Sequence, residues 1–266
     1  MTEPMRKNQT IAAAATTGAA AAGAAALLWR ADHRGPAAAI AATAAWCIGG
    51  AFAANTPLLG PLRRRGPAGG DAAALTFDDG PGPSTSDVLD ALAQEGVRAT
   101  FFVLGRQART HPELVARMHR EGHQVASHGD DHGILVFRGP GYVAGQLRRT
   151  ERAVADAAGP DALSRLFRAP HGFRGPATWP TVRAMGYRMA GWTAGVWDSA
   201  EPGTQVIVER CRSALTPGAV ILLHDADGWA PGKGRDQTAQ AIPGICAAAR
   251  DAGLRLVRMD QLVPAA

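Results

Sequence analysis

The stretch LTFDDGPGP, from Leu75 to Pro83, places two adjacent carboxylates directly after a short apolar run and directly before a turn rich in Gly and Pro. An apolar run that stops at such a turn is typical of a buried strand that ends in a loop. Asp78 and Asp79 repel each other there, and no basic residue stands beside them in the sequence. The pair therefore needs a partner from elsewhere in the chain, and a metal ion would relieve the repulsion.

From residue 71 onward, short apolar runs alternate with longer amphipathic runs. The strand-like runs are 73–77, 99–104, 123–127, 166–168, 187–192, 219–223 and 254–258, and the runs predicted to be helices are 86–95, 112–122, 142–158, 177–185, 204–215 and 237–252. This alternation predicts an α/β fold with a parallel sheet. None of the strand-like runs has the sequence pattern of an edge strand. This favours a closed or nearly closed barrel over the alternative, a doubly wound open sheet.

The N-terminal segment, 1–70, differs in composition from the main domain, 71–266. It holds seven Lys or Arg and two acidic residues, whereas the main domain holds 21 of each sign and gives no reason to expect nucleic acid. Two uncharged Ala-rich stretches, 11–29 and 37–62, are each near the ~20 residues that a membrane-spanning helix needs. We expect a membrane anchor with one or two transmembrane helices. The alternatives are a low-complexity linker and a cleaved signal peptide.

The orientation of this segment depends on how many stretches cross the membrane. If both cross, the basic residues favour termini on the inner side of the membrane. If only 37–62 crosses, they favour a main domain on the outer side. We expect a protein of the cell membrane whose main domain lies outside the cytoplasm, and the cytoplasmic face is the alternative.

Ionisable residues follow the predicted strands at the points where the strands end. In parallel α/β folds the loops at the carboxyl ends of the strands converge on one rim, where the chemistry takes place. The residues that this rule brings together are Asp78, Asp79, His128, His132, Arg168, Asp198 and His224.

The stretch HGDDH carries two histidines four residues apart, His128 and His132. With one carboxylate they form a three-ligand metal set that leaves positions open for water or substrate. A bound Zn²⁺ lowers the pKa of its water to about 7. The second aspartate could then accept the proton of that water, and His224 could protonate a leaving group. This set predicts metal-assisted hydrolysis of an amide or ester.

Five motifs resemble those of a known family in their order and approximate spacing: TFDDGPGP, SHGDDH, RAPHG, GVWD and ILLHD. The chain resembles the NodB-homology polysaccharide deacetylases, carbohydrate esterase family 4, over residues 71–262. The resemblance implies a distorted (β/α)7 barrel, here preceded by the predicted helical anchor. It also implies removal of N-acetyl groups from amino sugars by a divalent metal, usually Zn²⁺, with Co²⁺ or Ni²⁺ as alternatives.

The resemblance also implies roles for individual residues. Asp78 matches the general base, Arg168 the arginine that orients it, His224 the general acid and Asp198 the carboxylate that tunes that acid. Asp79, His128 and His132 match the metal ligands. For the substrate, the expected residues are Pro170, His171 with its backbone N–H facing the oxyanion, Gly172, Trp197, and Leu222 beside the acetyl group.

The chain departs from the family pattern in two motifs. Gly129 stands where a Ser or Thr is usual. In the fourth motif, Gly195 replaces a frequent Asp, Trp197 precedes Asp198, and Ser199 takes the usual place of Trp. These changes leave the metal and proton-transfer residues intact and suggest a subgroup with its own substrate.

Three other functions fit parts of the same pattern. The anchor motivates deacetylation or deformylation of a lipid-linked amino sugar at the membrane. The altered motifs motivate a glycan-binding module without catalysis. Two histidines and a carboxylate could also hold Fe(II) for oxygenase chemistry, although such an enzyme needs no second aspartate and no distant histidine.

Overall fold

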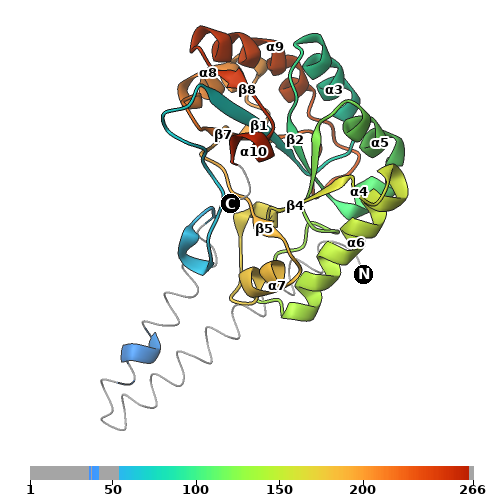
Figure 1. Cartoon of the computed structure of the whole chain (residues 1–266), viewed down its shortest axis with the longest axis vertical. Helices are drawn as coiled ribbons and strands as arrows, with labels where there is room; N and C mark the ends of the chain where they lie inside the picture. The colour runs from blue at the N-terminus through green and yellow to red at the C-terminus, as the bar shows by residue number, and fades with distance from the viewer. Residues whose placement is uncertain (1–35, 37, 42–53, 264–266) are drawn as a thin grey trace.

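The computed structural model describes residues 36, 38–41 and 54–263. Its centre is a curved parallel sheet surrounded by helices (Figure 1). Along the main path the strand order is β5-β4-β3-β2-β1-β7-β6, and β8 pairs separately with β1. The strands are β1 (Ala72–Asp78), β2 (Thr100–Val103), β3 (Gln124–Ser127), β4 (Leu163–Phe167), β5 (Arg188–Met189), β6 (Ala194–Gly195), β7 (Val220–His224) and β8 (Arg255–Leu256). The parallel (β/α)7-like fold is therefore confirmed.

Strand β1 lies at the centre of the sheet, as its apolar sequence predicts. Every residue after Ala72 is buried, which is typical of a parallel strand covered on both faces. Its register with β7 pairs Asp78 with His224, and its register with β2 pairs Asp78 with Phe102. The first and sixth predicted strands thus end side by side, with an acid and a histidine at the same level.

Except for the last one, the helices cover the outer side of the strands (Figure 1). They are α3 (Thr85–Gln94), α4 (Gly105–Thr110), α5 (Pro112–Arg120), α6 (Pro140–Ala158), α7 (Thr178–Ala184), α8 (Thr204–Ala214), α9 (Asp236–Asp251) and α10 (Met259–Leu262). Helix α4 was not predicted, because GRQART has no apolar stripe of helical period.

The core has two layers because side chains alternate across each strand. Phe77 and Phe101 stack with ring centroids 5.1 Å apart in the layer between strands and helices. Ala74 and Phe102 belong to a separate inner cluster, which Met259 of α10 joins. The interior of the barrel is therefore filled by side chains.

The predicted strand 187–192 is shorter in the structure. Within it only β5 forms and pairs with β4, whereas β6 follows after the predicted range and pairs with β7. Between them the chain crosses from one side of the barrel to the other, and Arg63 forms a parallel bridge to Ala190 beside this crossing. The predicted strand was therefore too long.

The end of the second predicted span also differs from expectation. Ala54–Leu62 contains a turn and the short 3-10 helix η1 (Pro57–Leu59), which Thr56 begins and Gly60 ends with a φ of 115°. The rest of both predicted spans lies outside the described residues, apart from a few positions at 38–41. Among the described residues, no helix combines the length and the apolar character that crossing a bilayer requires.

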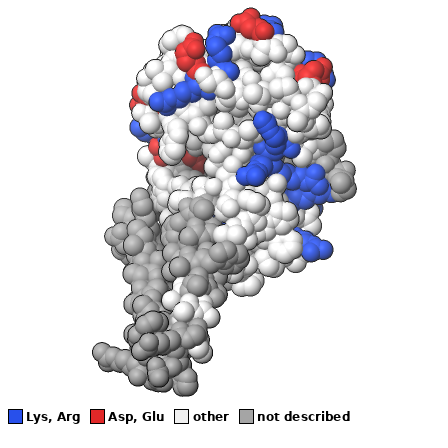
Figure 2. Space-filling view, turned by 90° about the vertical axis from the view of Figure 1, so that its left-hand side faces the viewer, with Lys and Arg blue, Asp and Glu red and all other residues white. Residues whose placement is uncertain are grey.

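Charged side chains of both signs are interspersed over the upper part of the face in Figure 2. This agrees with the balanced composition of residues 71–266. Cys211 and Cys246 are free cysteines, and both are buried in the outer core.

Candidate active site

Five of the ionisable residues predicted at the rim line a cavity of about 420 Å³, namely Asp78, Asp79, His128, His132 and His224. Asp78 is the last residue of β1, His224 is the last residue of β7, and Arg168 follows β4 directly. Successive residues of a strand normally face opposite sides. Asp79 leaves the strand with a φ of 78°, and both it and Asp78 line the cavity.

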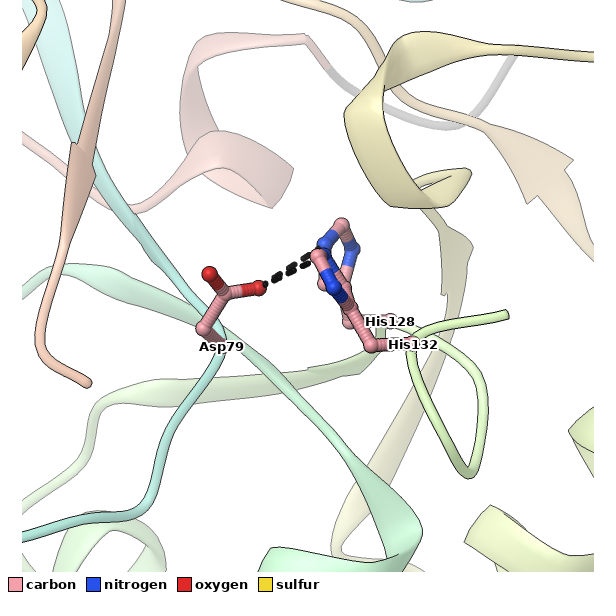
Figure 3. A group of neighbouring side chains, drawn as sticks. All are labelled: Asp79, His128 and His132. Carbon is pink, nitrogen blue, oxygen red and sulfur yellow. Dashed lines mark ion pairs between the residues drawn. The ribbon is translucent and has the colours of Figure 1, made fainter. Parts of the chain in front are cut away.

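Three of these residues form a compact buried cluster, Asp79, His128 and His132 (Figure 3). Asp79 Oδ1 lies 3.1 Å from His132 Nε2 and 3.4 Å from His128 Nε2. One ligand atom from each residue lies within 4.8 Å of the others. Asp79 Oδ1 is buried and has no hydrogen-bond partner among the described residues, and a cation between the three side chains would satisfy it. The donor set of two imidazoles and one carboxylate fits a divalent metal.

Neighbouring groups orient these three side chains. His128 Nδ1 lies 2.9 Å from the carbonyl oxygen of Arg168, which places the ring proton on Nδ1 and leaves Nε2 as the ligand atom. The backbone N–H of Gly228 donates to Asp79 Oδ2 at 3.1 Å. A Cβ at Gly228 would lie 2.5 Å from the ring of His132, so only glycine fits there. The loop after β7 thus supports the metal site.

The electrostatics of the cluster favour an ionised carboxylate. Burial alone would raise the pKa of Asp79, but the neighbouring rings of His132 and His128 hold it well below its ordinary value. The Asp79 carboxylate is therefore negative at neutral pH, as a metal ligand must be.

Asp78 is paired with a fully buried arginine. Arg168 Nη1 donates to Asp78 Oδ1 at 2.7 Å and to Thr76 Oγ1 at 2.8 Å, and Nη2 donates to the carbonyl oxygen of Gly191 at 2.8 Å. The guanidinium carbon lies 4.0 Å from the ring centroid of Phe102. Burial lowers the pKa of Arg168, and the charge of Asp78 opposes that effect. The second oxygen of Asp78, Oδ2, faces His128 Nε2 at 3.8 Å, so it points toward the metal cluster.

His224 is paired with Asp198 on the other side of the cavity. Its Nδ1 lies 2.9 Å from Asp198 Oδ1, and its backbone N–H donates to Oδ2 at 2.7 Å. Thr238 Oγ1 also donates to Oδ2, at 2.9 Å. Burial would lower the pKa of His224, but the carboxylates of Asp198, Asp79 and Asp78 outweigh it and raise the pKa to about 9. His224 is therefore a protonated acid at neutral pH in the metal-free protein.

Most of the predicted substrate-binding residues line the same cavity. They are His171, Gly172, Trp197 and Leu222, whereas Pro170 is buried and is not among the lining residues. The His171 ring stacks on Trp229 with a centroid distance of 5.2 Å and packs edge-on against His132 at 4.4 Å. Trp197 is 74% exposed at the rim.

The altered motifs leave the arrangement of the candidate site residues in place. Gln146 of α6 accepts hydrogen bonds from the backbone N–H groups of Asp130 and Asp131. A side chain from this helix thus holds the loop in which Gly129 replaces the usual Ser or Thr. Asp198 still holds His224 although Trp197 precedes it.

Other lining residues were not placed in the site by the sequence. Arg235 lines the cavity, and its guanidinium binds Asp227 Oδ2 at 2.8 Å. Asp227 also accepts hydrogen bonds from the backbone N–H groups of Trp229 and Ala230, so it shapes the loop and lines the cavity as well. The sequence did not point to Arg235, because this residue follows a Gly-rich loop and not the end of a predicted strand. Trp192 and Trp229 also line the cavity.

Comparisons with known proteins agree with this geometry. Residues 65–190 match the model of the polysaccharide deacetylase family. A chitooligosaccharide deacetylase of Bradyrhizobium sp. (strain ANU 289) is 38% identical over 216 residues, which cover 77% of this chain and 97% of the relative. The Bc1960 peptidoglycan N-acetylglucosamine deacetylase superposes with a TM-score of 0.70 and 28% identity, over 76% of this chain and 92% of that one.

A family 4 carbohydrate esterase from Streptomyces lividans, solved in complex with acetate, gives a TM-score of 0.61 and 33% identity, over 69% of this chain and 90% of that one. The alignment with the rhizobial enzyme spans nearly its whole length, and the buried Asp-His-His cluster lies in the cavity at the rim of the barrel. The chain belongs to the polysaccharide deacetylase family.

Proposed function

We propose that this protein is a metal-dependent hydrolase that removes N-acetyl groups from GlcNAc-type amino sugars of a cell-wall or surface polysaccharide. One observation carries the proposal: the cluster Asp79, His128 and His132 shares a cavity with Asp78 and His224, and these two residues are paired behind the cavity wall with Arg168 and Asp198. Amide hydrolysis needs an electrophilic centre, a base and an acid around one substrate, and these three groups supply them.

Asp79, His128 and His132 would hold the cation, through Oδ1 and the two Nε2 atoms. A divalent metal bound there would polarise the acetyl carbonyl and acidify a water molecule. We propose Zn²⁺, because two imidazoles and one carboxylate with open positions are typical of catalytic zinc, and Co²⁺ or Ni²⁺ would suit the same donors.

Two proton transfers fall to the side chains of the chain itself. Asp78 Oδ2 accepts a proton from the water that attacks the acetyl carbon, while Arg168 holds Oδ1. The C–N bond then breaks, and the amine nitrogen takes the proton of His224 Nε2. The products are acetate and the free amino sugar. Asp198 keeps Nδ1 of His224 engaged, so that Nε2 is the nitrogen that faces the substrate.

The aromatic and apolar wall would bind the sugar. Leu222 would contact the acetyl methyl group, and the backbone N–H of His171 would face the developing oxyanion. Trp197, exposed at the rim, offers an indole face to a sugar ring. These three roles rest on the lining of the cavity and on the family resemblance.

The substitution Asp78→Asn tests the proposal. It removes the base and keeps the shape, so acetate release from chitotetraose or from a peptidoglycan fragment should fall at least about 100-fold while bound metal stays stoichiometric. Asp87→Asn, an exposed carboxylate in α3, is the control and should retain parental turnover. Near-normal turnover of Asp78→Asn would rule out Asp78 as the base.

We also propose that the N-terminal segment anchors the chain in the cell membrane, with the catalytic domain outside. The two long Ala-rich stretches and their basic flanks support this. A reporter fused after residue 266 tests it, because a cytoplasmic C-terminus would favour a lipid-linked amino sugar as substrate over the mature wall polymer.

A further inference from the structure

Asn55, which precedes the residues matched by the family model, binds the wall of the catalytic cavity. Its Oδ1 accepts from the backbone N–H of Trp192 at 3.0 Å, and its Nδ2 donates to the carbonyl oxygen of the same residue. One side-chain amide thus satisfies both polar groups of Trp192, whose ring lines the cavity together with Ala54. In the sequence the two residues are 137 positions apart.

The contact requires particular residues on both sides. A Cβ on Gly191 would lie 2.1 Å from Asn55 Oδ1, so the neighbouring position admits only glycine. Asn55 has a φ of 60°, a conformation that asparagine adopts more readily than most residues. Nearby, the N–H of Gly191 donates to the carbonyl oxygen of Arg63 at 2.8 Å, and Thr193 Oγ1 donates to that of Arg64 at 2.9 Å. Asn55, Arg63 and Arg64 therefore contact the crossing between β5 and β6.

The same crossing holds the arginine of the base. The carbonyl oxygen of Gly191 accepts from Arg168 Nη2 at 2.8 Å, and the Trp192 ring centroid lies 5.7 Å from the guanidinium carbon. Arg168 in turn holds Asp78. A continuous series of contacts thus leads from Asn55 through Gly191 and Trp192 to the catalytic carboxylate. The crossing is irregular chain with few ladder hydrogen bonds, so its position depends on such side-chain contacts.

We propose that Asn55 is a positioning residue for the hydrolysis: it fixes the Gly191–Trp192 segment and thereby the Arg168 guanidinium and the indole wall of the cavity. This inference rests on the proposed function. It extends the catalytic unit to a segment before the matched range 65–190.

Variants of the full chain test this role. Asn55→Gly keeps the left-handed backbone accessible and removes both side-chain hydrogen bonds. Asn55→Asp keeps the acceptor for the Trp192 N–H and loses the donor. Leu58→Ala, 41% exposed in η1, is the matched control from the same segment. Two readouts are measured: kcat and KM for acetate release from chitotetraose, and the ¹⁹F resonance of Trp192 in 5-fluorotryptophan-labelled protein, assigned with Trp192→Phe.

Asn55→Gly should lower kcat about tenfold with KM within threefold, because small displacements of catalytic groups act on the chemical step. The kcat of Asn55→Asp should lie between those of Asn55→Gly and the parent, and the kcat of Leu58→Ala should equal that of the parent. The Trp192 resonance should shift or broaden in both Asn55 variants only. If Asn55→Gly keeps the kcat and the Trp192 resonance of Leu58→Ala, the positioning role is wrong.

The two readouts also separate this inference from the proposed function. A parent protein that releases no acetate from any GlcNAc substrate contradicts the proposed function, whereas the resonance still reports whether Asn55 sets the position of Trp192. An Asn55→Gly variant that loses kcat with an unmoved Trp192 signal would overturn the proposed route through Gly191 and Trp192.

Discussion

Arg168 and Asp78 form a buried ion pair in which Nη1 and Oδ1 are 2.7 Å apart, although the residues are 90 positions apart in the chain. Arg168 is fully buried, and its guanidinium group also donates hydrogen bonds to Thr76 and Gly191. Breaking a buried pair of this kind leaves an uncompensated charge. The pair therefore fixes one oxygen of Asp78 and leaves the other facing the metal cluster.

Replacing Arg168 with lysine should reduce kcat about 100-fold. A single ammonium cannot reach Asp78, Thr76 and Gly191 in the planar geometry of the guanidinium, so Asp78 would lose its fixed orientation. Steady-state kinetics of acetate release measure the effect. Arg165→Lys, at a 63% exposed side chain, is the control, and an equal loss in both variants would contradict the positioning of Asp78 by Arg168.

Removing a ligand should remove the metal. Asp79→Asn or His132→Gln should weaken metal affinity at least about 100-fold, because each deletes a donor from a buried three-residue set. Metal content after dialysis, measured by mass spectrometry, checks this. His111→Gln, between α4 and α5, should bind metal like the parent, and full occupancy in the Asp79 and His132 variants would show that the ion lies elsewhere.

The pH dependence of kcat should report the Asp198–His224 pair. The pKa of His224 is about 9 in the metal-free protein because nearby carboxylates, above all Asp198, favour the protonated ring against the effect of burial. Asp198→Asn removes that charge, so the pKa of His224 should fall and the alkaline decline of kcat should move to lower pH. An unmoved alkaline limb would mean that another group acts as the acid.

The same pair should contribute to stability in a defined pH range. A folded-state pKa of about 9 against an ordinary value of 6.5 means that the contribution is complete below about pH 6.5 and is lost as pH rises through 9. Urea unfolding of the metal-free protein between pH 6 and pH 10 measures it. Asp198→Asn should flatten the decline, and a parallel decline in both proteins would assign it to other groups.

Trp197→Ala should raise KM for chitotetraose about threefold to tenfold, the effect of losing one stacking contact. The indole is 74% exposed, so the melting temperature should hardly change. Val206→Ala, another exposed apolar side chain, is the control. If KM stays at the parental value, the sugar does not bind across Trp197.

Part of this fold could be predicted because its causes are local. The apolar run before Asp78 and the turn after Asp79 specify where β1 ends, and the alternation of short and long periodic runs specifies a parallel sheet. Helix α4 and the break between β5 and β6 could not be predicted, because packing against distant segments imposes them on sequences without a clear period.

The features of the site also fall into those that the sequence predicts and those that it does not. The sequence by itself determined which residues reach the rim, since parallel strands deliver their carboxyl ends to one side. Only the tertiary structure decided that Arg168 is buried on Asp78, that Gln146 ties the loop in which Gly129 lacks a hydroxyl, and that Asn55 holds Trp192. Those contacts join residues far apart in the chain, and their distances depend on how the barrel closes, which no local pattern encodes.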